Sequence, residues 1–60
     1  IMEYKNAQYH KDPMDTDKII AIHVEYGGHT LIVPLDSANR HYVEIMEKVK
    51  EGTLTIKDAD

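Results

Sequence analysis

Four histidines and a cluster of three aspartates have the greatest capacity for chemistry in this 60-residue chain. Histidine titrates near neutral pH and is the commonest metal ligand in proteins. His23 and His29 fall on opposite faces of the strands predicted below, and His10 and His41 lie in other segments. A metal ion needs converging ligands, so we predict no metal site within one copy. A site between symmetry-related copies stays an open alternative.

The three aspartates, Asp12, Asp15 and Asp17, flank Pro13 in an acidic segment. A calcium loop of the EF-hand type requires a central glycine and a bidentate glutamate at its twelfth position, and this segment has neither. Proline favours turns because it fixes φ, and aspartate favours them because it bonds to nearby backbone amides. We therefore predict a solvated acidic loop over residues 11 to 18.

Catalytic groups are poorly represented. Cysteine is absent, and Ser37 is better placed to cap a helix than to act as half of a Ser/His pair. The carboxylate pairs of glycosidases need a cleft that holds them about 5 to 9.5 Å apart, which a chain this short can hardly enclose. Gly27 and Gly28 lead into a strand and not into a helix, so they do not form a phosphate-binding loop. We predict a non-enzymatic protein without a cofactor.

A β-hairpin over residues 18 to 34 is the clearest structural signal. Two strands, 18 to 26 and 29 to 34, flank Gly27-Gly28, a two-residue turn whose positive φ values glycine accepts. In this register Tyr26 lies opposite His29, which sorts the side chains onto two faces. The predicted core face carries Ile20, Ile22, Val24, Tyr26, Leu31 and Val33. The opposite, mixed face carries Ala21, His23, Glu25, Thr30 and Ile32.

Residues 2 to 9 are predicted to add a third strand with a bulge near Asn6, because the alternation of apolar side chains changes phase there. The expected fold is therefore α+β, with an antiparallel sheet of three strands packed on one C-terminal helix. We expect one domain over residues 1 to 60. Ile1 precedes Met2, and we expect that Met2 is the natural start or that the chain is a processed fragment; whether Ile1 is native stays open.

The C-terminal helix is predicted over about residues 37 to 51, after Pro34 closes the hairpin and Asp36 or Ser37 provides a cap. Gly52 supplies the left-handed residue that ends many helices. Residues 53 to 60 are expected to form a short strand or a tail, in which Leu54 and Ile56 can dock together. An apolar stripe at helical spacing is predicted to pack on the sheet, formed by Ala38, Tyr42, Ile45, Met46 and Val49.

Composition narrows the classes of partner. Eleven acidic against seven basic residues give a net charge of −4, which repels nucleic-acid phosphates. No apolar run approaches the roughly 20 residues that cross a bilayer, and no secretion signal is recognisable. The core of so short a chain rarely contributes more than about 3 to 5 kcal/mol to folding stability. Disulfides cannot add to it, because the chain has no cysteine. We therefore expect a soluble protein that forms a homo-oligomer or joins a larger protein.

The chain contains four tyrosines and neither phenylalanine nor tryptophan. Tyrosine suits surfaces that are apolar along the ring and wet at the hydroxyl. Tyr42 belongs to the helix stripe and is predicted to be core. The candidate interface combines the other tyrosines with the mixed sheet face, which a single helix cannot cover: Tyr4, Tyr9, Ile19, Ala21, His23, Tyr26 and Ile32.

The C-terminal part resembles a family. The run Leu-Asp-Ser-Ala-Asn-Arg-His-Tyr at 35 to 42, then Ile45-Met46, Val49, Gly52 and Asp-Ala-Asp at 58 to 60, resembles a segment of short proteins from tailed bacteriophages, including marine and cyanobacterial phages. That segment reads Asn-x-x-Tyr-x-x-Ile, a Trp-Val pair, Gly-Asn and Pro-Ala-Asp. The chain departs from it in having Lys48 for Trp, Thr53 for Asn and Asp58 for Pro.

The resemblance implies a small phage protein concerned with the tail or virion, and it implies no active site. Its matched positions Asn39, Tyr42, Ile45, Val49 and Gly52 look fold-defining, as do Gly27, Gly28 and Met46 from the patterns above. We expect a protein-protein interaction module of virion or tail assembly, located in the host cytoplasm or the virion. The alternative is a regulator of a host enzyme, whose basic surface would meet the acidic loop. The identity of the partner stays open.

Overall fold

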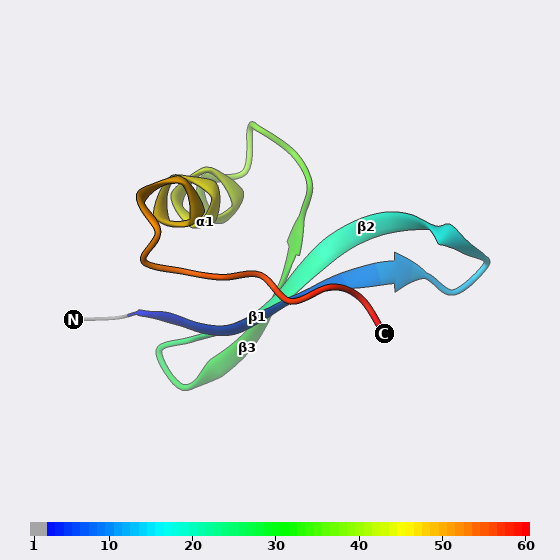
Figure 1. Cartoon of the computed structure of the whole chain (residues 1–60), viewed down its shortest axis with the longest axis horizontal. Coiled ribbons are helices and arrows are strands. Elements are labelled where there is room, and N and C mark those ends of the chain that lie inside the picture. Colours follow the sequence, from blue (N-terminus) through cyan, green and yellow to red (C-terminus); the bar gives the residue numbers. More distant parts are fainter. Residues whose placement is uncertain (1–2) are drawn as a thin grey trace.

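Three antiparallel strands followed by one helix make up the fold of the computed structural model, which describes residues 3 to 60 (Figure 1). The expectations for Ile1 and Met2 lie outside the described residues. The strands are β1 (Tyr4–Asp12), β2 (Asp15–Tyr26) and β3 (His29–Pro34), and the helix is α1 (Arg40–Glu51). The sheet order is β1-β2-β3. The predicted α+β class is confirmed.

The β2–β3 hairpin has the predicted register. Tyr26 pairs with His29, and the pairing continues through Val24 opposite Leu31 to Ala21 opposite Pro34. Gly27 and Gly28 have φ values of 60° and 82°. Positive φ at both turn residues is typical of the type I′ turn, whose twist matches that of the flanking strands.

The predicted bulge in β1 is also confirmed. Asn6 has a φ of 54°, and the pairing with β2 shifts between Lys5 and Gln8. The Asn6 amide donates a hydrogen bond to the Glu25 carboxylate on β2. The extra residue changes the phase of the strand, so Ala7 enters the core at 1% exposure.

The predicted acidic loop over residues 11 to 18 is wrong, because β1 and β2 continue to Asp12 and Asp15 and leave a turn at Pro13-Met14. Two aspartates stabilise this turn locally. Asp12 Oδ1 accepts from the Met14 amide at 2.8 Å, and Asp15 Oδ1 accepts from the Asp17 amide at 3.2 Å. These side-chain bonds tighten the turn within a few residues and do not stop the strands from pairing.

The helix begins three residues later than predicted. Asn39 is the N-cap, and its side chain accepts from the Tyr42 amide at 3.1 Å. The predicted cap Asp36 instead accepts from the Ala38 amide at 2.9 Å, which holds a separate turn before the helix, and Ala38 is exposed. Gly52 ends the helix with a φ of 83°, as predicted.

Replacing this cap should weaken the fold measurably. Asn39→Ala is expected to lower the free energy of unfolding by about 0.5 to 2 kcal/mol, because the Tyr42 amide loses its acceptor. Ser37→Ala is the matched control, since Ser37 is exposed and lies before the cap. Urea denaturation followed by circular dichroism measures both. A larger loss in Ser37→Ala would contradict the observed helix start.

The core lies at one end of the sheet, between the strands, α1 and the C-terminal segment. Leu54 and Ile56 pack against it, and the Lys57 backbone pairs with β1. The Tyr9 amide donates to the Lys57 carbonyl at 3.0 Å, and the Lys57 amide donates to the Ala7 carbonyl at 2.9 Å. The buried residues of this core are Tyr4, Ala7, Ile22, Val24, Val33 and Ile45.

Beyond this core, the β1–β2 hairpin projects as an arm (Figure 1). We call residues 12 to 20 the hairpin arm. Ile20, predicted to be core, is 38% exposed because the helix packs at the other end of the sheet. No helix within residues 3 to 60 is long and apolar enough to span a membrane.

Candidate functional site

The outer edge of β3 offers backbone groups for pairing with another chain. In a two-residue hairpin the residues flanking the turn exchange hydrogen bonds, and the pattern then alternates along the strand. Tyr26 and His29 flank the turn, so Thr30 and Ile32 point their N–H and C=O groups away from β2. Among the described residues, no hydrogen bond engages these outward groups. An edge of this kind is a template for strand addition.

The opposite edge of the sheet is protected in two ways. The bulge at Asn6 breaks the regular spacing of β1, and the backbone of Lys57 occupies the amide of Tyr9 and the carbonyl of Ala7. The Gln8 side chain adds a bond from Nε2 to the Asp58 carbonyl at 3.0 Å. Bulges and covering segments are the usual means by which proteins block an edge strand. The sheet therefore has one blocked edge and one open edge.

Ile32 is the most exposed apolar side chain of the three-stranded part of the sheet, at 67%. It lies on the face turned away from α1, as predicted, and Ile19 is 41% exposed. Ala21, which we expected on the exposed surface, is buried at 5%. Its methyl group lies between His10 on β1 and Pro34 on β3, and these larger neighbours cover it.

The hairpin arm exposes three apolar side chains. Ile19 and Ile20 are 41% and 38% exposed, and Met14 at the tip is 92% exposed. Asp15 and Asp17 are exposed beside them, while Asp12 is half-buried. The arm therefore combines the three predicted acidic residues with apolar side chains at a position remote from the core.

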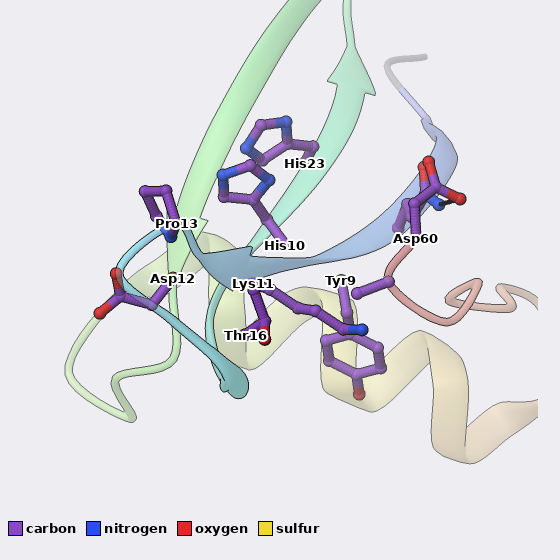
Figure 2. Close-up of a pocket in the computed structure, with 10 residues that line it drawn as sticks. Tyr9, His10, Lys11, Asp12, Pro13, Thr16, His23 and Asp60 are labelled. Carbon is purple, nitrogen blue, oxygen red and sulfur yellow. Dashed lines mark hydrogen bonds between the residues drawn. The ribbon is translucent and has the colours of Figure 1, made fainter.

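His10 and His23 stack on the far face of the sheet, an arrangement we did not predict. Their ring centroids lie 4.2 Å apart with an interplanar angle of 22°. Figure 2 shows the two rings on one side of β1 and the Tyr9 ring on the other. The rings line a groove of about 340 Å³, to which the C-terminal Asp60 also contributes.

The histidine stack does not present converging metal ligands. Nearly parallel imidazoles aim their nitrogens along parallel lines, so they do not converge on one ion. His23 Nε2 is buried without a hydrogen-bond partner in the part of the chain that the structure describes. No group of three or more metal-ligating side chains gathers within that part.

Tyr4, expected at an interface, is instead a core residue at 6% exposure. Its ring stacks on Tyr26 with centroids 4.5 Å apart. Its hydroxyl donates to Glu44 Oε1 at 3.1 Å and lies 2.9 Å from His41 Nδ1. The hydroxyl has one proton and the carboxylate can only accept, so His41 Nδ1–H donates to Tyr4. These contacts tie β1 to the first turns of α1.

Burial, and after it the hydrogen bond to Glu44 and the negative charge of Glu44, together raise the pKa of Tyr4 from 10.0 to about 12. A phenol with a raised pKa stays protonated at neutral pH. It acts as a hydrogen-bond donor here and not as a nucleophile or a base. Arg40 approaches Glu44 at 3.9 Å, but the Arg40 side chain is 82% exposed and the distance is long, so this pair contributes little.

The candidate interface residues therefore divide into three sets. Ile19 and Ile32 are exposed, and Tyr4 and Ala21 are buried. The third set is half-buried: His23 belongs to the histidine stack, and Tyr9 and Tyr26 pack partly against the core. The histidine stack is recognisable in the sequence only if β1 is extended to residue 12, because His10 then falls beside Ala21 and diagonal to His23.

Comparisons with protein-family models, with curated proteins and with solved structures found no match. The arrangement of residues described above is therefore the basis for a functional proposal.

Proposed function

We propose that this chain is a non-enzymatic protein-protein interaction module that binds another protein chain through β3 and the exposed sheet face around Ile32. The observation that supports it is the coincidence of an unpaired strand edge with an apolar side chain that is 67% exposed on the same strand. When a strand adds to a sheet edge, the backbone hydrogen bonds supply affinity, and the contacts of the side chains on either face supply specificity.

Ile32→Lys tests this surface. The variant should keep the fold, because Ile32 is exposed, but it should weaken association at least about tenfold, since a lysine charge opposes burial of the patch by more than about 1.4 kcal/mol. Light scattering across a concentration series gives the solution mass relative to the 6.9 kDa monomer. Circular dichroism reports the fold.

Met14→Lys is the matched control, because Met14 is more exposed but lies at the tip of the hairpin arm. Equal weakening by both substitutions would mean that the arm contributes as much as β3. The proposal fails if the wild-type chain is monomeric at every concentration and Ile32→Lys retains the same bound proteins as wild type in capture experiments. Unfolding of monomeric Ile32→Lys would show that this residue is part of the core.

We propose further, from the resemblance of residues 35 to 60, that the partner belongs to a tailed phage and that the module serves virion or tail assembly. An exposed strand edge suits such assembly because it can pair with a strand of another copy or of a larger virion protein. Mass spectrometry of purified particles tests this proposal. Recovery of the chain in many copies per particle is expected, and its absence from particles would exclude a virion component.

The hairpin arm favours one alternative, a regulator that binds a host enzyme. Asp15 and Asp17 are exposed on the arm. Because the arm projects beyond the core, these carboxylates can approach a basic surface while the core stays clear of it. Binding through these charges would weaken as salt rises, because exposed charge pairs are screened. The combined substitution Asp15→Asn and Asp17→Asn should then abolish binding to the enzyme while leaving self-association unchanged.

A further inference from the structure

We infer that β3 pairs with β3 of a second copy, antiparallel and about a two-fold axis at Leu31, to form a continuous six-stranded sheet. This inference rests on the proposed function and specifies its partner and its register. An isologous interface of this kind requires one self-complementary segment, because each copy presents the same surface to the other.

The outward backbone groups define this register. With the axis at Leu31, Thr30 of one copy lies opposite Ile32 of the other, and both residues point their N–H and C=O groups across the interface. Each Thr30–Ile32 pair can therefore exchange two hydrogen bonds. The two symmetry-related pairs use every outward backbone group of Thr30 and Ile32.

Moving the axis by one residue to Ile32 gives a poorer match. Thr30 then lies opposite Pro34, which has no N–H to donate. The Thr30 carbonyl would stay unpaired, and the Pro34 carbonyl already accepts from the Asp36 amide at 2.9 Å. The proline at the end of β3 thus selects the Leu31 axis over its neighbour.

Side chains support the same register on both faces of the sheet. On the face that contacts α1, the two Leu31 side chains meet beside Val24, which is buried in the core of each copy. On the far face, Ile32 lies beside Thr30 of the other copy. The contact therefore reduces the exposure of Ile32 and continues the apolar row of each core across the axis.

Charge also favours a second copy at this edge. The chain has a net charge of −4 and 30% charged residues, so most surfaces of two copies repel each other. Strand β3, however, contains no aspartate, glutamate, lysine or arginine. Pairing along β3 therefore brings no acidic or basic side chains of β3 together across the axis.

Disulfide trapping tests the register directly, because the chain has no cysteine. Thr30→Cys and Ile32→Cys change exposed side chains and should leave the fold intact. Oxidising a mixture of the two variants should give a covalent dimer, since a hydrogen-bonded pair places its Cα atoms about 5.5 Å apart, within the range for a disulfide. Either variant alone should crosslink at least about tenfold more slowly, because its copies are diagonal neighbours at about 7 to 8 Å.

Met14→Cys, at the exposed arm tip, gives the rate of crosslinking by random collision. Faster crosslinking of Ile32→Cys alone than of the mixture would overturn the Leu31 axis in favour of an Ile32 axis. The wild-type chain could form oligomers while the mixture crosslinks no faster than Met14→Cys. This result would overturn the β3 contact, and the chain would then self-associate through another surface. A chain that is monomeric and crosslinks at the collision rate would overturn this inference, and the capture experiment with Ile32→Lys then decides the proposed function separately.

Discussion

Ile45→Ala is expected to unfold most of the protein at ambient temperature. Ile45 is fully buried, and it is the residue of α1 that enters the core beside Ile22, Val24 and Val33. Removing a buried isoleucine side chain to alanine costs about 2 to 5 kcal/mol, because the lost transfer energy adds to the cost of the cavity. The core of a domain of this size rarely supplies more than about 3 to 5 kcal/mol of stability. The substitution therefore removes most or all of the stability.

Val43→Ala provides the matched control on the same helix. Val43 is 39% exposed, so the same replacement by alanine should change the free energy of unfolding by well under 1 kcal/mol in the absence of a cavity. Thermal unfolding followed by circular dichroism compares the two. If Ile45→Ala kept the melting temperature of the wild type, the helix would not be anchored through this residue.

Alkaline pH should destabilise the protein through Tyr4. The pKa of Tyr4 is about 12 in the folded chain against 10.0 for an ordinary tyrosine. The folded state therefore keeps the proton where the unfolded state has lost it, and the stabilisation is complete below pH 10 and disappears as the pH rises to about 12. The full shift corresponds to about 2.7 kcal/mol, which solvent screening at the partly exposed partners reduces to about 1 to 2 kcal/mol.

Tyr4→Phe isolates this effect, because other groups also titrate at alkaline pH. The difference in free energy of unfolding between wild type and Tyr4→Phe should shrink between pH 9 and pH 12. The tyrosinate absorbance of the wild type should include a step near pH 12, and Tyr4→Phe should remove that step. Glu44→Gln should move it to lower pH, since the carboxylate charge is gone. A difference that stays constant with pH would refute the buried hydrogen bond.

The position of the core explains why the candidate interface is so exposed. Helix α1 and residues 53 to 57 cover one end of the sheet, and this leaves both the hairpin arm and the outer edge of β3 without a partner in the same chain. A two-stranded hairpin is marginally stable alone in water. Contact with another protein would therefore stabilise the arm as well as cover Ile32.

Local rules were enough for much of the fold. The Gly27-Gly28 turn and the alternation on either side determined the β2–β3 register, because two positive φ values and a period of two leave few alternatives. The change of phase at Asn6 indicated the bulge. The apolar spacing of Tyr42, Ile45, Met46 and Val49, ended by Gly52, indicated the helix and the face that it packs. These features depend on neighbours in the chain.

Other features depend on contacts between distant residues, and the tertiary structure alone decided them. Pairing of β1 with β2 converted the predicted acidic loop into an arm, because the gain from the ladder outweighs the turn preference of its aspartates. Burial of Tyr4 followed from partners at positions 41 and 44, and burial of Ala21 followed from neighbours on both adjacent strands. The sequence by itself determined strands, turns and helix; which strand edge stays open was decided by where the C-terminal segment docks, since Lys57 reaches β1 and not β3.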